Sequence, residues 1–398
     1  MRNDMNWENK KLGEVYDVRD GTHDSPKYIE VGYPLVTSKN LKNGEVNFEK
    51  VKFISDTDFI NINKRSKVDK GDVLFAMIGT IGNPTLITEE PNYAIKNVAL
   101  FKVGKEQNGQ YLKYYLESDS VVSKMLEDAK GTTQKFVGLG YLRSFEIPIP
   151  TLEEQKAIVA KLDQAFAAID QAKANIEKNI ANAKELFQSK LNQIFSQKAE
   201  GWEERTLQEL CEKITDGSHN PPKGVEKSSY LMLSSKNVFD DSINFSNPRY
   251  LTKEDFISEN KRTDVKENDV LLTIVGTIGR VAVVPRLDNY FVLQRSVAVL
   301  KPIPTEINSR FLKYTLRNAI VYLQENSRGV AQKGIYLNQL KQINLFIPNL
   351  LLQQQIVTQL DQLQEQTNLL VTKYQQKLAN LEELKKSILE KAFKGELV

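Results

Sequence analysis

The chain has 398 residues, of which 40% are hydrophobic and 26% are charged, the balance of a soluble globular protein. Its length exceeds what one hydrophobic core usually serves, so we expect more than one domain. No apolar run approaches the roughly 18 residues of a membrane span, and the first residues, Met1 to Lys10, are polar. The single cysteine, Cys211, permits no internal disulfide. These features exclude a membrane-embedded or disulfide-stapled protein, and we expect a cytoplasmic location without membrane partners.

The net charge of +3 is small, and the charges are evenly distributed along the chain. Residues 1–150 carry 21 Lys and Arg against 21 Asp and Glu, and residues 199–348 carry 20 against 18. No segment is a basic tail. If the chain binds nucleic acid, the positive face must be local, or partner proteins must supply part of the phosphate contact.

In chain order, short motifs of the first half recur in the second half with a spacing that drifts only between 195 and 200 residues. A repeat on this scale indicates two copies of one unit, each a globular domain followed by a long helix. We therefore expect domains at 1–150 and 199–348, a central spacer helix at 151–198 and a C-terminal spacer helix at 349–398. The recurring motifs are Trp7 and Trp202, Asp20-Gly21-Thr22-His23 and Asp216-Gly217-Ser218-His219, Ser38-Lys39-Asn40 and Ser235-Lys236-Asn237, and Gly79-Thr80-Ile81-Gly82 and Gly276-Thr277-Ile278-Gly279.

Within each globular copy, short apolar segments rich in Val, Ile and Phe predict strands. These segments are Asp72 to Ile78, Asn97 to Val103, Val270 to Val275 and Ser296 to Leu300. Apolar residues at spacings of three and four predict helices at Tyr111 to Glu127 and Ser309 to Gln324. The expected class is α+β, with two β-rich globular domains.

The stretch from Pro150 to Phe195 predicts one uninterrupted helix, because it contains no Gly and no Pro after Pro150. Apolar residues recur every seven positions in two seams, the pattern of a coiled coil, and Lys173 is the one interruption. The seam residues are Leu152, Val159, Phe166, Ile180, Phe187 and Ile194, together with Leu162, Ile169, Ile176 and Ala183.

The partner helix lies in the same chain, from Pro348 to Phe393, with its seam offset by 198 residues. Because the termini of a compact domain often lie close together, the second helix should start where the first one stops and run back antiparallel to it. We therefore expect an internal pseudo-two-fold repeat, with the globular domains at opposite ends of a two-helix coiled coil. Two inverted domains suit a two-part linear target such as duplex DNA.

The repeated loops supply candidate DNA contacts. In Ser38, Lys39 and Asn40, and again in Ser235, Lys236 and Asn237, a phosphate partner is combined with an amide that can pair with adenine. A polar turn after a strand would explain the same residues. The only histidines, His23 and His219, follow Thr22 and Ser218 at equivalent positions, and we expect a DNA contact or a framework hydrogen bond from each. A zinc site is not expected, because no cysteine or second histidine is near.

The Gly-Thr-Ile-Gly segments resemble a phosphate cradle, but no Gly-Lys-Ser or Gly-Lys-Thr follows, so they do not form a P-loop. A turn that brings backbone amides to a DNA phosphate and a simple framework turn both remain open for Gly79, Thr80, Gly276 and Thr277. A second pair of loops places Lys or Arg side chains around a glycine and a glutamine. The cations can bind the DNA backbone and the glutamine can read a base edge. A loop that only faces solvent would have the same composition. The residues of this second pair are Lys130, Thr132, Thr133, Gln134 and Lys135 in the first copy and Arg328, Gln332 and Lys333 in the second.

The copies diverge most in two loop pairs, which we expect to determine specificity. They are Asp24 to Pro34 against Asn220 to Tyr230, and Asn83 to Lys96 against Arg280 to Arg295. Arg280 and Arg295 are candidate DNA contacts in the second pair.

The chain as a whole resembles the specificity subunit of type I restriction-modification systems. The resemblance rests on Gly-Thr-Ile-Gly in each copy, on the helix starts Ile149-Pro150-Thr151-Leu152-Glu153-Glu154-Gln155 and Ile347-Pro348-Asn349-Leu350 leading to Gln355, and on the closing Ala392-Phe393-Lys394-Gly395-Glu396-Leu397. Each motif is short, but their order, duplication and spacing are specific.

The resemblance implies two target-recognition domains that each read half of an interrupted double-stranded DNA sequence. It also implies that the helices dock two adenine methyltransferase subunits, for which Leu152, Gln155, Leu350 and Gln355 are the candidates, and that restriction subunits join the full complex. Such a subunit is not itself an enzyme, so the resemblance implies no catalytic residues, and we expect no cofactor and no metal.

Two other classes of function remain open. Phe136-Val137-Gly138-Leu139-Gly140 and Asn220-Pro221-Pro222-Lys223 imitate motifs of DNA amino-methyltransferases, but they lie in different domains, and Lys223 replaces the aromatic residue that stacks on a flipped base. No cluster of carboxylates indicates a nuclease. A structural adaptor, with the coiled coil between two protein-binding domains, also fits the sequence and agrees with the lack of a strong basic patch.

Overall fold

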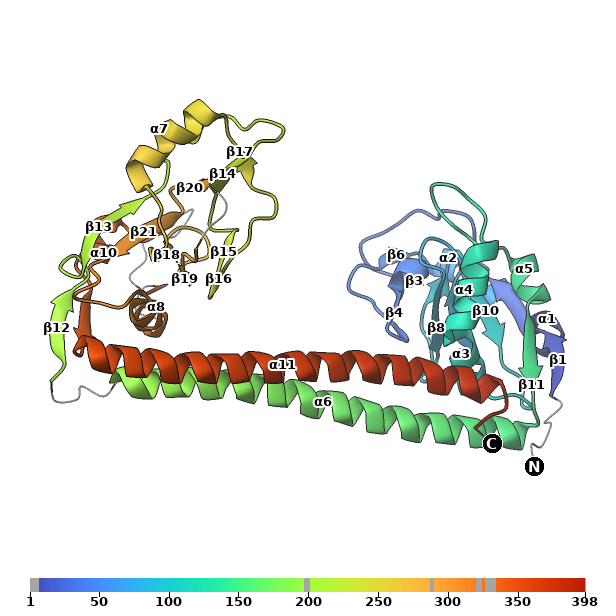
Figure 1. The fold of residues 1–398 in the computed structure, drawn as a ribbon. Coiled ribbons are helices and arrows are strands. Elements are labelled where there is room, and N and C mark those ends of the chain that lie inside the picture. The colour runs from blue at the N-terminus through green and yellow to red at the C-terminus, as the bar shows by residue number, and fades with distance from the viewer. Residues whose placement is uncertain (1–6, 197–200, 287–289, 320–323, 326–333, 398) are drawn as a thin grey trace. The chain divides into compact units, whose positions relative to one another are not determined.

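The computed structural model describes residues 7–196, 201–286, 290–319, 324–325 and 334–397. The chain forms two compact units, which we call unit 1 (residues 1–177 and 374–398) and unit 2 (residues 178–373). The globular part of unit 1, residues 7–149, is called domain 1, and that of unit 2, residues 201–347, is called domain 2. Figure 1 labels the helices and strands of both units.

Domain 1 is built on a four-stranded antiparallel sheet of order β2-β10-β7-β8 and a three-stranded sheet of order β6-β3-β9. The first sheet comprises β2 (Asp17–Asp20), β7 (Val73–Ala76), β8 (Gly82–Leu86) and β10 (Val98–Lys102), and the second β3 (Tyr33–Val36), β6 (Lys52–Ile54) and β9 (Ala94–Ile95). Domain 1 also has two separate strand pairs. In one, β1 (Glu8–Lys11) pairs with β11 (Glu146–Ile149), and in the other, β4 (Leu41–Lys42) pairs with β5 (Glu45–Val46). The helices are α1 (Leu12–Val15), η1 (Ser38–Asn40), α2 (Asp56–Ser66), α3 (Gly109–Glu117), α4 (Asp119–Asp128) and α5 (Leu139–Ser144).

Domain 2 repeats this topology with the sheet orders β13-β21-β18-β19 and β17-β14-β20. Its strands are β12 (Glu203–Thr206), β13 (Cys211–Asp216), β14 (Tyr230–Leu233), β15 (Val238–Phe239), β16 (Ser242–Ile243), β17 (Arg249–Tyr250), β18 (Val270–Thr273), β19 (Val281–Val283), β20 (Tyr290–Leu293), β21 (Val297–Pro302) and β22 (Asn344–Ile347). Its described helices are α7 (Lys253–Thr263), α8 (Ser309–Asn318) and α10 (Leu337–Lys341). The predicted α+β class and internal repeat are thus confirmed.

The four predicted strands correspond to β7, β10, β18 and β21. The predicted helix Tyr111 to Glu127 is two helices, because the backbone of Ser118 is extended (φ −66°, ψ 140°) and separates α3 from α4. The predicted helix Ser309 to Gln324 corresponds to α8, and residues 320–323 of that range lie outside the described residues.

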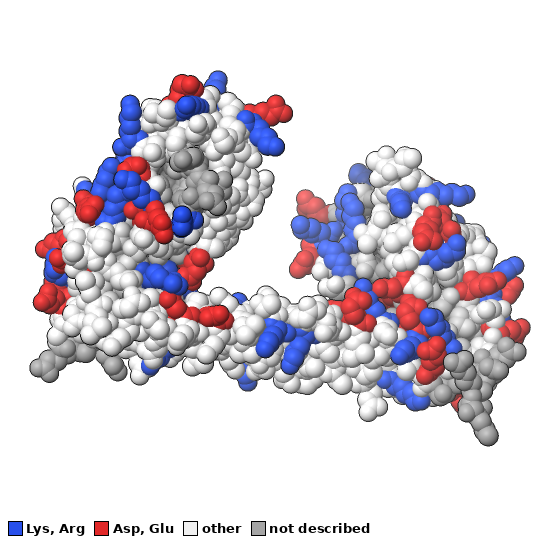
Figure 2. Space-filling view, in the orientation of Figure 1, with Lys and Arg blue, Asp and Glu red and all other residues white. Residues whose placement is uncertain are grey.

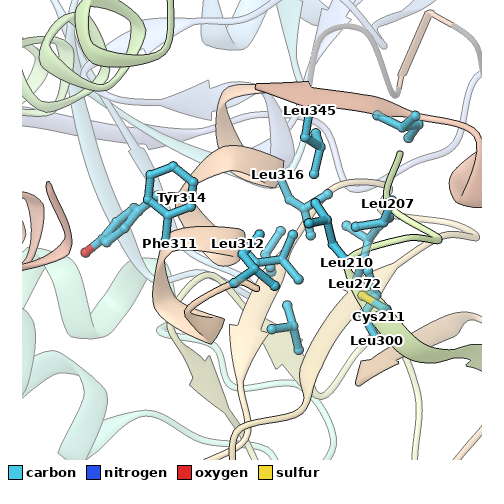
Figure 3. Close-up of a cluster of buried hydrophobic side chains, with 14 of the residues drawn as sticks. Leu207, Leu210, Cys211, Leu272, Leu300, Phe311, Leu312, Tyr314, Leu316 and Leu345 are labelled. Carbon is cyan, nitrogen blue, oxygen red and sulfur yellow. The ribbon is translucent and has the colours of Figure 1, made fainter. Parts of the chain in front are cut away.

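The largest core of unit 2 joins the sheet, α8 and the long helices (Figure 3). Leu272 and Leu300 from adjacent strands meet Phe311 and Leu312 of α8, and all four side chains are fully buried. Cys211 lies in the same cluster, and burial raises the pKa of its thiol to about 12. This thiol is therefore a packing group and not a nucleophile.

Two long helices, α6 (Leu152–Ser196) and α11 (Leu350–Phe393), contribute to both units. In unit 1, Phe166 of α6 joins the core that contains Leu389 and Ala392 of α11. In unit 2, Phe187 of α6 joins the core that contains Val357 of α11. Early residues of one helix thus pack with late residues of the other in each unit, which confirms the predicted antiparallel pair.

The seam position Lys173, which interrupts the apolar repeat of α6, forms an ion pair with Glu382 of α11 at 2.5 Å between Nζ and Oε1. This interaction lowers the pKa of the Glu382 carboxyl. A charged pair at a seam specifies which turns of the two helices meet, because any other register would leave one charge against apolar neighbours.

Each domain is attached to the start of its long helix by the same set of hydrogen bonds, which we call the helix-start junction. In unit 1 the Oε1 atom of Gln155 accepts from the Asn108 N–H at 2.9 Å, and its Nε2 donates to the Pro150 carbonyl at 3.0 Å. The Tyr114 hydroxyl donates to Asp163 Oδ1 at 2.5 Å, and burial raises the pKa of this phenol, so the hydroxyl keeps its proton. The junction fixes domain 1 on α6.

Unit 2 has the same junction. Gln353 accepts from the Asn308 N–H at 2.8 Å and donates to the Pro348 carbonyl at 2.9 Å. The Tyr314 hydroxyl donates to Asp361 Oδ1 at 2.7 Å. Gln155 and Gln353 are both fully buried, so both amides serve the junction.

Candidate nucleic-acid interface

Three loops meet at one end of each four-stranded sheet. In domain 1, β2 ends at Asp20, which pairs with Ala99, and β7 ends at Ala76, which pairs with Val98, the first residue of β10. The residues that follow β2 and β7 therefore lie beside those that precede β10. We call this edge the loop end, and domain 2 has the same edge, where Asp216 pairs with Ala298 and Thr273 with Val297.

A buried aspartate holds a histidine and an arginine at the loop end of domain 1. Asp20 Oδ2 accepts from His23 Nε2 at 2.8 Å, and Asp20 Oδ1 accepts from Arg65 Nη2. The side chain of Asp20 is only 6% exposed, whereas those of His23 and Arg65 are 61% and 67% exposed. Burial of a carboxylate is costly unless hydrogen-bond donors surround it, and these bonds hold the His23 imidazole and the Arg65 guanidinium in place at the surface.

Domain 2 repeats this group. Asp216 Oδ2 accepts from His219 Nε2 at 2.8 Å, and its Oδ1 accepts from Arg262 Nη2. The Arg262 Nε also donates to the Asp216 carbonyl at 2.9 Å. The prediction that the two histidines are equivalent is confirmed, and each makes the framework hydrogen bond that was one of the two expectations. We call Asp20, His23 and Arg65, and likewise Asp216, His219 and Arg262, the Asp-His-Arg group.

The loop end of domain 2 also encloses a pocket of about 480 Å³. The Asp-His-Arg group lines it together with Arg295 and Tyr336, and Tyr336 is 62% exposed. Of these lining residues, His219 and Arg295 were predicted from the sequence, whereas Asp216, Arg262 and Tyr336 were not.

The loop end of domain 1 brings the Gly-Thr-Ile-Gly turn against the Lys130 to Lys135 loop. The Gly79 N–H donates to the Lys135 carbonyl at 3.0 Å. Gly79 has φ +80°, and a Cβ there would lie 3.3 Å from the Gln134 Nε2 atom. Thr80 and the loop residues Lys130, Thr132, Thr133, Gln134 and Lys135 are all exposed. The turn thus has a framework role and presents the candidate contact loop at the surface.

In domain 2 the same turn is present, with φ +82° at Gly276 and +96° at Gly279, and Thr277 is exposed. Arg280 lies over the Phe239 ring at 4.8 Å from its centroid, and its Nη1 donates to the Val238 carbonyl at 3.5 Å. Arg280 therefore has a framework role. The predicted contacts Arg328, Gln332 and Lys333 lie outside the described residues.

The Ser-Lys-Asn turns lie next to the loop end. Ser38 Oγ donates to the Asn97 carbonyl at 3.0 Å, and the Ser235 N–H donates to Ser296 Oγ at 3.0 Å. Lys39 and Lys236 are exposed, and neither forms an ion pair within the described residues. Both lysines are free to contact phosphate.

The asparagines of these turns correct the expectation of an adenine contact. Asn40 Oδ1 accepts from the Thr37 N–H at 2.9 Å, and Asn40 Nδ2 donates to the Asn47 carbonyl at 2.9 Å. Asn237 makes the equivalent bonds to the Ser234 N–H and the Asn244 carbonyl. Both side chains are buried, so the amides close the turn. This agrees with the alternative given above, a polar turn after a strand.

The remaining candidates occupy mixed environments. Thr22 is half-buried and its Oγ1 accepts from the Asp24 N–H at 3.2 Å, while Ser218 is buried. Neither hydroxyl is well placed for a contact at the surface, in contrast to the exposed His23 and His219 beside them.

At the helix starts, Gln155 is buried in its junction, which corrects its assignment as a docking residue. The junction equivalent of Gln155 is Gln353, whereas Gln355 is exposed. Leu152 is half-buried and Leu350 is 40% exposed, beside Leu351 at 72%.

The fragments that imitate methyltransferase motifs have local structural roles. Phe136 forms a bridge with Lys130, and Gly138 precedes α5. The Pro222 carbonyl of the other fragment accepts from Arg249 Nη1 at 2.8 Å. Within the described residues no group of His, Cys, Asp or Glu could hold a metal ion. No described helix is long and apolar enough to cross a membrane.

Lys and Arg side chains are interspersed with Asp and Glu over the face that Figure 2 shows. This agrees with the near-neutral charge of both globular segments, so contacts to an acidic ligand must come from specific groups and not from a broad field.

The fold defines the class: a duplicated protein of two α+β domains, each joined to a long helix. The family model described as "Type I restriction modification DNA specificity domain" matches residues 5–182 and 199–380, and the chain belongs to this family. It is a specificity subunit of a type I restriction-modification system, as the resemblance indicated.

Named relatives agree. Over 359 residues the chain is 28% identical to the type I restriction enzyme EcoBI specificity subunit of Escherichia coli, covering 82% of this chain and 73% of that one. It is 23% identical over 401 residues to the EcoKI specificity subunit of Escherichia coli strain K12, covering 93% and 84%.

Two solved structures share the fold at 22% sequence identity. A chain from a type I R-M system, in work on complex assembly and conformational transition, has a TM-score of 0.74 and covers 98% of both chains. The HsdS subunit from Thermoanaerobacter tengcongensis has a TM-score of 0.61, covering 99% of this chain and 98% of that one.

Among the loop-end residues, sequence reasoning missed Asp20, Arg65, Asn97, Asp216, Arg262 and Tyr336. A usable signal was present for four of them, because Asp20 recurs as Asp216 and Lys64-Arg65 recurs as Lys261-Arg262 at the repeat spacing. Asn97 had no such signal, since its contact with His23, at 2.8 Å from Oδ1 to Nδ1, joins residues 74 positions apart.

Proposed function

We propose that this specificity subunit binds a bipartite, interrupted DNA sequence, with one half-site read by the loop end of each domain. One observation carries the proposal: both domains hold the same Asp-His-Arg group at the same edge of the same sheet. Exposed arginine and imidazole side chains fixed by a buried carboxylate are suited to phosphate oxygens and base edges.

Other loop-end residues would complete the contact. Lys39 and Lys236 reach phosphates as exposed cations, and the loop from Lys130 to Lys135 offers Gln134 for a base edge. Because the net charge is only +3, methyltransferase partners would supply much of the phosphate contact.

The partners proposed for the helices are two methyltransferase subunits, docked at the helix starts, with restriction subunits joining the full complex. Leu350 and Leu351 support this at the second helix start, because exposed leucines side by side favour a protein contact. The subunit itself would carry no catalytic residue and no cofactor, and it would act in the cytoplasm.

The experiment is a methylation map of DNA from cells that express the chain with its methyltransferase, compared with cells that express the methyltransferase alone. We expect an interrupted motif, methylated on both strands, only when the chain is present. If the assembled complex leaves methylation unchanged, and its DNA affinity does not vary with salt, the chain is a structural adaptor.

A second experiment tests whether the paired helices set the gap between half-sites. Deleting one heptad from both α6 and α11 shortens each by about 10 Å. We expect the gap to shrink by about three base pairs, at about 3.4 Å each, with both half-sites unchanged. A folded variant with the original gap would contradict a ruler role.

A further inference from the structure

The loop ends of the two domains share one backbone frame. The Thr22 N–H donates to the Ile95 carbonyl at 3.0 Å, and the Asn97 N–H donates back to the Thr22 carbonyl at 3.2 Å. In domain 2 the Ser218 N–H donates to the Leu293 carbonyl at 2.7 Å, and the Arg295 N–H donates to the Ser218 carbonyl at 2.9 Å. Counted from Thr22 and Ser218, Asn97 and Arg295 therefore occupy matching positions, and domain 2 has one additional residue, Ser296, between this position and β21.

Both positions adjoin the Asp-His-Arg group of their domain. Asn97 Oδ1 lies 2.8 Å from His23 Nδ1, and His23 Nε2 is bound in turn to Asp20. Arg295 lines the same pocket as His219 and Arg262. Within the described residues the Arg295 guanidinium has neither a hydrogen bond nor an ion pair, and its side chain is exposed.

This arrangement separates shared from variable contacts. A side chain present in both domains, such as Arg65 or Arg262, offers the same contact to either half-site and cannot distinguish them. Asn97 places an amide beside the Asp-His-Arg group of domain 1, whereas Arg295 places a guanidinium beside that of domain 2. Asparagine pairs bidentately with adenine, and arginine pairs bidentately with guanine, in the major groove.

We propose that Asn97 and Arg295 are equivalent base-reading residues, with Asn97 reading an adenine in the half-site of domain 1 and Arg295 reading a guanine in that of domain 2. The proposal rests on the proposed function and names residues and bases for it. The Asp-His-Arg group positions the reader in domain 1, through His23, and holds Arg262 beside the reader in domain 2.

Three further features fit these roles. Asn97 has φ +54°, a backbone conformation that asparagine tolerates better than most residues. Whichever end of its amide faces His23 Nδ1, one Nδ2 hydrogen and one Oδ1 lone pair remain free for a bidentate contact with adenine. In domain 2, Tyr336 precedes α10 at the position where Gly138 precedes α5 in domain 1, so at this position the wall beside Arg295 carries an aromatic ring and domain 1 carries a glycine.

The test maps the methylated motif for complexes containing the wild-type chain, Arg295→Gln, Asn97→Asp or Lys253→Gln. Glutamine favours adenine and aspartate favours cytosine. We expect Arg295→Gln to change preference at one guanine of the domain 2 half-site by roughly 5- to 150-fold, and Asn97→Asp to do the same at one adenine of the domain 1 half-site.

The other half-site should stay unchanged in each variant. Lys253→Gln removes one exposed positive charge at the far end of α7 from Arg262, and it should leave the motif as in the wild type.

The outcomes separate the two proposals. If the wild-type complex gives no interrupted motif, the proposed function fails. If it gives one, but Arg295→Gln lowers methylation evenly with no change in the motif, Arg295 contacts phosphate and the inference is overturned. An unchanged motif in a folded Asn97→Asp complex overturns the assignment of Asn97 in the same way.

Discussion

The helix-start junctions and the loop ends have diverged to different extents between the two copies. At the junctions, Gln155 and Gln353 are both fully buried and make the same pair of backbone hydrogen bonds. At the loop ends the Asp-His-Arg group is repeated, but Asn97 is replaced by Arg295. The two copies therefore share the glutamine that joins each domain to its helix, and they differ in the residue that lies beside the Asp-His-Arg group.

The physical reason lies in what each place tolerates. A buried amide with its bonds satisfied allows almost no replacement, because each lost partner leaves a backbone group without a hydrogen bond. An exposed side chain beside a rigid group can change without loss of stability. A stable frame with exchangeable exposed residues is what a family of sequence readers requires.

The largest predicted effect concerns the junction. Gln353→Leu removes the acceptor for the Asn308 N–H and the donor to the Pro348 and Glu306 carbonyls. We expect the free energy of unfolding to fall by about 3 kcal/mol, at about 1 kcal/mol or more per unsatisfied group. Denaturant unfolding of the full chain measures it.

The control is Gln355→Leu, two residues away and exposed, which should change stability by less than about 0.5 kcal/mol. Equal losses in both variants would show that the hydrogen bonds of Gln353 do not hold the junction.

The next effect concerns the shared part of the loop end. Asp216→Asn removes the charge that fixes His219 and Arg262. We expect the DNA affinity of the assembled complex to fall by about tenfold, the size of one charge-assisted contact, with the methylated motif unchanged. Quantitative binding over a salt series measures it. A changed motif would mean that the group reads bases directly, and the division into shared and variable contacts would be wrong.

A smaller effect is expected at the turn that both domains share. Gly79→Ala forces a residue with a Cβ into φ +80°, which should lower the free energy of unfolding by about 1 kcal/mol. Gly276→Ala, with φ +82°, should do the same in domain 2. Gly138→Ala is the matched control, because no atom lies near its Cβ position and its φ is −82°. Different losses in the two domains would show that the turns are not equivalent.

The sequence predicted the parts of this molecule that depend on local pattern. The seven-residue repeat from Leu152 to Ile194 predicted α6, and the repeat spacing predicted that domain 2 copies domain 1. Both signals are carried by many residues, so single exceptions such as Lys173 did not obscure them.

The candidate site was less accessible to sequence reasoning. Asn40 has the chemistry of a base reader, but it is buried and closes its own turn. The sequence predicted Asn97 as the start of a strand, but its side chain lies against His23, which follows the neighbouring strand β2. Which amide closes a turn and which faces outward depends on contacts between distant segments, and residue type alone does not show it.

The smallest predicted effect tests whether the exposed lysines of the loop end belong to the shared contact. Lys39→Ala should weaken DNA binding of the complex by less than tenfold and reduce the slope of log affinity on log salt by about 0.9, the value for one phosphate contact. Lys105→Ala is the matched control, since this exposed lysine follows β10 at the sheet edge away from the loop end, and its slope should stay that of the wild type. Because Lys236 holds the same place in domain 2, Lys236→Ala should lower the slope by the same amount, and the double variant by twice that amount. If only one of the two lysines contributes, the two loop ends contact their half-sites differently, even though their turns are built alike.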